Sequence, residues 1–132
     1  MQSLACKSTG TLIDEWLTAT IKAGKMPKEE NIIRRDNLFR LVVEDRLGGD
    51  LTKVADQITS LYKTLQECWD AQENIMFFKQ YFPAQMDPTD YNKLGHAAIT
   101  AQETNAQRNK LIREIDTILG EAEFTQLEKT YA

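Results

Sequence analysis

Residues 50–82 decide the fold, and they read DLTKVADQITSLYKTLQECWDAQENIMFFKQYF. The residues that recur in this stretch at alternating three- and four-residue steps are Leu51, Val54, Ile58, Leu61, Leu65, Cys68, Gln72 and Ile75. Gln72 is the one polar member, and Ala55, Tyr62, Trp69 and Met76 widen the stripe. This spacing is that of one face of an amphipathic helix, and no strand pattern fits it. We therefore predict one long helix from Asp50 to about Phe82, and we expect the rest of the chain to cover its apolar face.

Two shorter helices are predicted before this stretch. Ser8, Thr9 and Thr11 offer N-cap oxygens to a first helix from Thr11 to Ala23, which Gly24 is well placed to end. A second helix is expected from about Lys28 to Leu47, and Gly48 and Gly49 form its stop. The adjacent β-branched pair Val42 and Val43 weakens the helical prediction locally.

A fourth helix is predicted after the long one. Asp87-Pro88-Thr89-Asp90 combines an Asp cap, Pro at the first helical position and an acid at the third. The helix is expected to run to about Leu119 and to stop at Gly120, and residues 121–132 to add a terminal helical turn through Phe124, Leu127 and Tyr131. Two helices of about thirty residues with a short connector form an antiparallel hairpin about 45 Å long.

The sequence thus predicts an all-α fold, an up-down helical bundle built on a long antiparallel helical hairpin. The 132 residues are expected to form a single domain with residues 1–10 as a flexible N-terminal lead-in. Because the shorter helices cannot cover the whole hairpin, a homodimer is expected to cover the remainder.

Composition narrows the function classes. The net charge of −4 and the alternation of basic with acidic residues argue against a nucleic-acid partner. No apolar run is long enough to span a membrane, and the N-terminus has no signal-peptide core. Two cysteines, Cys6 and Cys68, are too few for a disulfide framework, so we expect a cytoplasmic protein with reduced thiols.

The middle of the fourth predicted helix is polar on the face that we expect to point inward, at Gln102, Asn105, Arg108 and Asn109. A buried guanidinium without a partner is very costly, so Arg108 should meet a carboxylate, water or a ligand anion. The candidate carboxylates are those of Asp14, Glu15, Asp70 and Glu73. Three interpretations remain open: the polar belt fixes helix register, it forms a pocket in which Arg108 and Arg35 hold an anion, or it faces solvent.

Acidic residues on the long helix offer a metal-dependent alternative. Glu67-x-x-Asp70 matches half of the magnesium-binding signature of the all-α nucleotide pyrophosphohydrolases. That signature also requires an earlier Glu-x-x-Glu pair, which this sequence lacks, so Glu67, Asp70 and Glu73 are also compatible with a solvated acidic flank. The lone histidine, His96, is expected at an intermediate or exposed helix position.

Two segments carry short motifs. The first is Gly10-Thr11-Leu12-Ile13-Asp14, followed by Thr18-x-x-Ile21-Lys22, and the second is Thr104-Asn105-x-x-Arg108, followed later by Glu128-Lys129-x-Tyr131. They resemble the opening and closing patterns of a family of small bacterial and phage helical proteins of unknown function. The chain departs from the family at Thr11, Glu15 and Gln107, where the family has an acid, a lysine and the first of two paired arginines. The resemblance implies a helical fold and singles out Asp14, Asn105 and Arg108.

These observations lead to two functional hypotheses. The first is a non-enzymatic cytoplasmic protein that acts by assembly or partner binding, without a cofactor. The second is a small enzyme that handles an anionic ligand, similar to a nucleotide pyrophosphohydrolase and dependent on Mg²⁺, with its site at the polar belt. The residues that would bind the ligand are Asp14, Arg35, Asp70, Glu73, Asn105 and Arg108.

Overall fold

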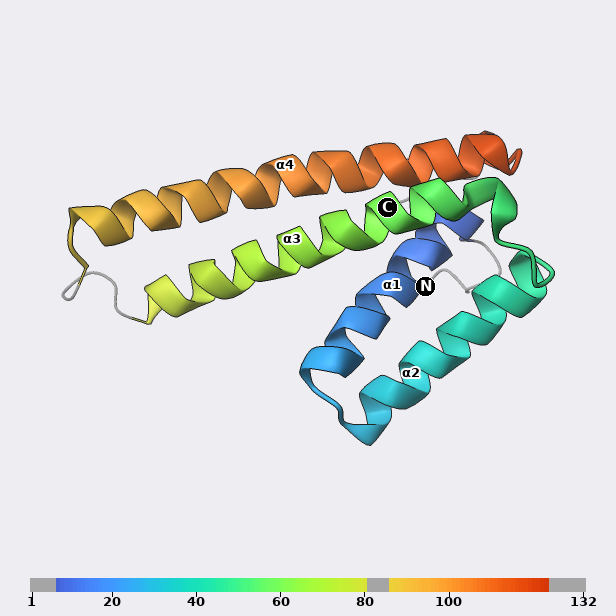
Figure 1. The fold of residues 1–132 in the computed structure, drawn as a ribbon, viewed down its shortest axis with the longest axis horizontal. Helices are drawn as coiled ribbons and strands as arrows, with labels where there is room; N and C mark the ends of the chain where they lie inside the picture. The colour runs from blue at the N-terminus through green and yellow to red at the C-terminus, as the bar shows by residue number, and fades with distance from the viewer. Residues whose placement is uncertain (1–6, 81–85, 124–132) are drawn as a thin grey trace. The chain divides into compact units, whose positions relative to one another are not determined.

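The computed structural model describes residues 7–80 and 86–123, and every regular element in these two ranges is helical. Its α-helices are α1 (Thr9–Lys25), α2 (Glu29–Phe39), α3 (Ala55–Lys79) and α4 (Pro88–Ile118) (Figure 1). A π-helix, η2 (Arg40–Arg46), continues α2, and a 3-10 helix, η3 (Thr52–Val54), leads into α3. The predicted all-α fold class is confirmed.

The chain forms two compact units. Unit 1 consists of Met1–Tyr62 and Lys110–Ala132, and unit 2 of Lys63–Asn109. α3 therefore begins in unit 1 and ends in unit 2, whereas α4 begins in unit 2 and ends in unit 1.

Unit 1 is built around large aliphatic side chains. Those with no exposed surface come from α1, η2, η3, α3 and α4, and they are Leu12, Ile13, Val42, Val54, Leu61 and Ile115. α1 and α2 pack against each other, with the rings of Trp16 and Phe39 edge-to-face at 5.7 Å. Burial of this kind contributes about 1.5–3 kcal/mol for each large apolar side chain, so these side chains stabilise unit 1 strongly.

The two adjacent valines Val42 and Val43 lie in the π-helix η2, whose turn is wider than that of an α-helix. The wider turn ends with Leu47 N–H donating to the Val42 carbonyl at 3.0 Å, and both valines lie inside. The predicted second helix thus continues through this β-branched pair, as the π-helix Arg40–Arg46. Gly48 and Gly49 then stop the helix with φ of 60° and 81°, as predicted.

The predicted ends of α4 are confirmed by its hydrogen bonds. The Asp90 N–H donates to the Asp87 carboxylate at 2.9 Å, and the Asp87 N–H donates back to the Asp90 carboxylate at 3.2 Å. This reciprocal pair satisfies backbone donors that an uncapped helix leaves open. At the other end Gly120 has φ of 74°, which suits the residue that follows a helix.

α1 begins at Thr9 rather than at the predicted Thr11, because Ser8 is its N-cap. It ends at Lys25 rather than at Ala23, so Gly24 lies inside the helix and does not end it. The last residues of the expected flexible lead-in, Ser8 to Gly10, are therefore buried. Three predicted features lie outside the described residues: Cys6, the end of the long helix at residues 81–82, and the apolar residues of the terminal turn.

In unit 2, parts of α3 and α4 lie side by side and antiparallel (Figure 1). The Cys68 Sγ lies 3.9 Å from the Asn105 Oδ1, within reach of a weak hydrogen bond. Small side chains dominate the buried set of this unit, which includes Thr64, Leu65, Ala71, Ala97, Ala101 and Thr104. Small residues let two helices approach closely, but they bury little apolar surface.

Candidate functional site

An open groove of about 600 Å³ runs along unit 2. Its lining residues come from both helices of the unit, and they are Glu67, Asp70, Ala71, Asn74, Phe77, Phe78, Lys93, His96, Ala97 and Thr100. Ala71 and Ala97 are buried, with 4% and 7% of their surface exposed, so they form the floor. The four charged or ionisable residues of the lining are exposed, so they form the rims.

The antiparallel pairing gives the groove two different ends. The two helices run antiparallel and residue 68 lies beside residue 105, so each step forward along α3 is matched by a step back along α4 (Figure 1). Glu67 and Asp70 therefore lie toward one end, which we call the acid end. Lys93 and His96 lie toward the other, the lysine end, where the rings of Phe77 and Phe78 meet edge-to-face at 5.5 Å.

The groove combines an apolar floor with hydrogen-bonding and charged rims. Asn74 and Thr100 add neutral polar groups between its two ends. The described parts of the chain contain no group of three or more His, Cys, Asp or Glu side chains placed to hold a metal ion. An apolar floor with charged edges suits a peptide helix better than a small charged molecule.

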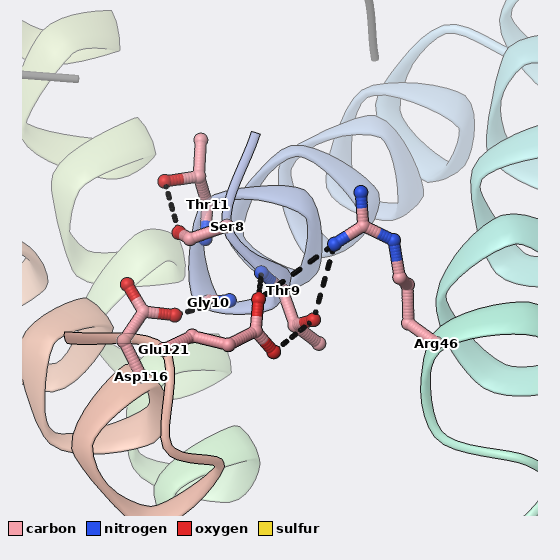
Figure 2. Close-up of polar contacts among 7 residues, drawn as sticks. All are labelled: Ser8, Thr9, Gly10, Thr11, Arg46, Asp116 and Glu121. Carbon is pink, nitrogen blue, oxygen red and sulfur yellow. Dashed lines mark hydrogen bonds and ion pairs between the residues drawn. The ribbon is translucent and has the colours of Figure 1, made fainter. Parts of the chain in front are cut away.

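A second polar cluster lies in unit 1, at the N-terminus of α1 (Figure 2). The Thr9 N–H donates to the Glu121 carboxylate at 3.1 Å, and the Gly10 N–H donates to the Asp116 carboxylate at 2.7 Å. The Thr11 N–H donates to the Ser8 Oγ at 3.1 Å, and the Leu12 N–H donates to the Ser8 carbonyl at 3.0 Å. All four donors of the first helical turn are thus satisfied within the chain.

Arg46 completes this cluster from η2. Its Nη1 lies 3.7 Å from a carboxylate oxygen of Glu121 and donates to the Thr9 Oγ1 at 3.4 Å (Figure 2). The Thr9 hydroxyl in turn donates to Glu121 at 2.6 Å. A free helix N-terminus attracts anions, but here two carboxylates of the chain already occupy it. The cluster therefore stabilises unit 1 by joining α1, η2, the end of α4 and the segment after it.

The six residues predicted to bind a ligand fall in different units. Asp14 and Arg35 belong to unit 1 and the other four to unit 2. Asp14 is buried with 4% exposed, whereas the Arg35 Nε donates to the neighbouring Asp36 at 3.0 Å on the surface. In unit 2, Asp70 lines the groove, and Glu73 accepts a hydrogen bond from the Trp69 indole at 2.6 Å. A ligand-binding role for this set stays a prediction.

The prediction that a polar belt on α4 faces inward is wrong, because the buried face of the helix is a different one. Gln102, Asn105 and Asn109 are exposed, and Arg108 is half-buried. The buried residues of this face are instead Ala97, Ala101, Thr104, Leu111 and Ile115. Because the inward face carries small or apolar residues, α4 does not bury Asn105, and of the polar residues in the expected belt only Arg108 is partly buried.

Some residues of the groove and of the polar cluster at the start of α1 belong to no recognisable sequence pattern. Lys93 has no motif, and His96 lies at an exposed helix position as expected. Asp116, which has no exposed surface, sits among Ile112, Ile115 and Ile118. An acid within an apolar helical stretch is a usable signal, because burial of a carboxylate requires hydrogen-bond donors nearby.

Comparison of the chain with protein-family models, curated proteins and solved structures finds no match. The resemblance to the family of small bacterial and phage helical proteins therefore stays a prediction. Among the described residues, no helix combines the length and apolarity that crossing a membrane requires.

Proposed function

We propose that this chain is a non-enzymatic protein of the cytoplasm that acts by docking a helix of a protein partner in the groove of unit 2. The groove itself is the observation that carries this proposal: a wall from each of two helices, a floor of small buried residues and charged rims. An amphipathic helix laid in such a groove places its apolar side on the floor and its polar side toward solvent.

The exposure of Phe77 supports a protein partner. More than half of the surface of this residue, 54%, is exposed at the lysine end of the groove. A docked helix would remove this apolar surface from water, at a gain of about 25 cal/mol for each Å² buried. The carboxylates of Glu67 and Asp70 on the rim would repel a phosphate-rich ligand, so a nucleic acid or nucleotide fits this groove less well.

Nuclear magnetic resonance with synthetic peptides tests the proposal. The probes are amphipathic helical peptides with leucines on one face and charges of either sign at either end, titrated into the ¹⁵N-labelled chain. We expect at least one peptide to give saturable shifts that concentrate at Ala71, Asn74, Ala97 and Thr100. If no peptide gives saturable shifts at these residues at protein concentrations where the chain is monomeric, the proposal is wrong.

A pair of tryptophan variants shows where the peptide binds. Ala97→Trp places an indole on the floor of the groove and should abolish the shifts. Ala98→Trp is the matched control, because Ala98 is exposed and does not line the groove. Equal binding by the two variants would contradict docking in the groove.

A further inference from the structure

We propose that the partner is a second copy of this chain, whose unit 2 docks on the groove about a two-fold axis that sets the acid end of each groove against the lysine end of the other. This inference rests on the proposed function and names its partner. It follows from the distribution of charge along the groove, because Glu67 and Asp70 lie at one end and Lys93 and His96 at the other.

A surface with opposite charges at its two ends is complementary to itself when the ends are exchanged. A two-fold axis across the groove makes this exchange, and every contact then occurs twice. Glu67 of one copy faces Lys93 of the other, and Lys93 of the first faces Glu67 of the second. Without the exchange, the Glu67 and Asp70 carboxylates of one copy would meet those of the other at the same end, and they would repel each other.

The apolar floor and the charged rims of the groove make different contributions to association. The apolar floor and the exposed Phe77 supply the area that association removes from water. The rim charges contribute little to affinity while they face solvent, but they select the orientation by penalising like-charge contacts. Each groove thus carries both the acidic and the basic groups that the interface requires, so two copies of this chain are sufficient to pair them.

Charge reversal tests the two-fold arrangement directly. The oligomeric state of the full chain is measured by analytical ultracentrifugation from about 1 to about 500 µM, for the wild type, Glu67→Lys and Lys93→Glu. We expect a wild-type dimer, and we expect each variant to dissociate at concentrations higher by roughly tenfold or more, since its two interface contacts become like-charged. Both positions are exposed, so helix content by circular dichroism should not change.

An equimolar mixture of the two variants gives the decisive result. In a heterodimer, the two reversed side chains would face each other with opposite charges at one contact. The other contact would keep the native Glu67 and Lys93, so dimerisation should return to the wild-type level. Glu103→Lys and Lys63→Glu are the matched controls, because both positions are exposed in unit 2 and neither lines the groove. These control variants should dimerise like the wild type.

The possible outcomes separate this inference from the function on which it rests. A wild type that stays monomeric at the highest concentration, reversed variants that dimerise normally, or a mixture that fails to recover would each overturn the second copy as the partner. Saturable peptide shifts in the same monomeric protein would leave helix docking in place with a different partner. Loss of both the dimer and the peptide shifts would overturn both proposals.

Discussion

At the scale of single residues, Gly10 shows how closely unit 1 is packed. A Cβ at this position would lie 2.5 Å from the Asp116 Oδ1 and 2.7 Å from the Ile112 carbonyl oxygen. The same Asp116 oxygen accepts the Gly10 N–H at 2.7 Å. The first turn of α1 therefore touches α4 at a point where only glycine leaves enough space.

The variant Gly10→Ala should lower the free energy of unfolding by about 1–3 kcal/mol, because the methyl group forces the carboxylate and the α4 backbone to move. The higher helix propensity of alanine, worth up to about 1 kcal/mol, does not compensate. Urea denaturation followed by circular dichroism measures the change. Gly24→Ala is the control, since nothing lies within 4 Å of its Cβ position, and it should leave stability equal or slightly higher. A Gly10→Ala chain as stable as the wild type would contradict this close approach.

At the scale of helices, the sequence predicts the termini of α4 better than its inward face. Capping depends on a few neighbouring residues, so Asp87 and Gly120 can be identified without knowledge of the fold. The inward face of α4 is marked only by small residues such as Ala97, Ala101 and Thr104, which carry a weak hydrophobic signal. The sequence pattern therefore predicts the wrong phase for that helix and places the exposed Asn105 inside.

Neither the groove nor the cluster at the start of α1 can be assembled from the sequence. Each requires contacts between segments far apart in the chain, such as Thr9 with Glu121. Local patterns give the helices, but only tertiary packing decides which two faces meet. Asp70 is a predicted site residue that does line the groove, although the sequence argument for it rests on metal-ligand spacing.

The entry into η3 gives a prediction about pH. Hydrogen bonds from the side chain and then the backbone N–H of Thr52, with the charge of Lys53, hold the pKa of Asp50 below its ordinary value. A lowered pKa means that this carboxylate stabilises the fold above its unfolded pKa, and that the contribution is lost as pH falls through the folded pKa. Thr52→Val removes the hydroxyl donor but keeps the N–H, so the pKa of Asp50 should rise partway toward its ordinary value.

A carboxyl carbon titration of Asp50 by nuclear magnetic resonance checks this shift. Thr59→Val serves as the control, because the Thr59 hydroxyl donates to the Ala55 carbonyl and not to Asp50. An Asp50 titration that is the same in Thr52→Val and wild type would show that the hydroxyl does not lower the pKa.

At the scale of the whole molecule, the two units differ in what they bury. Unit 1 encloses fully buried leucine, isoleucine and valine side chains, whereas alanine and threonine make up most of the buried set in unit 2. Large aliphatic side chains contribute more to stability than small ones when they are buried. The opening of a segment that buries little apolar area requires less free energy than global unfolding.

Amide hydrogen exchange should therefore separate the units. We expect amides of α3 within residues 63–79 to exchange faster than those around Leu12 and Leu17 in α1 by roughly tenfold or more at low protein concentration. If a second copy covers the groove, protection in unit 2 should rise with protein concentration, because association favours the closed form. The Ala97→Trp variant should lack this rise, and Ala98→Trp should keep it. Equal exchange in α1 and α3 would show that the small residues of unit 2 pack as stably as the aliphatic core of unit 1.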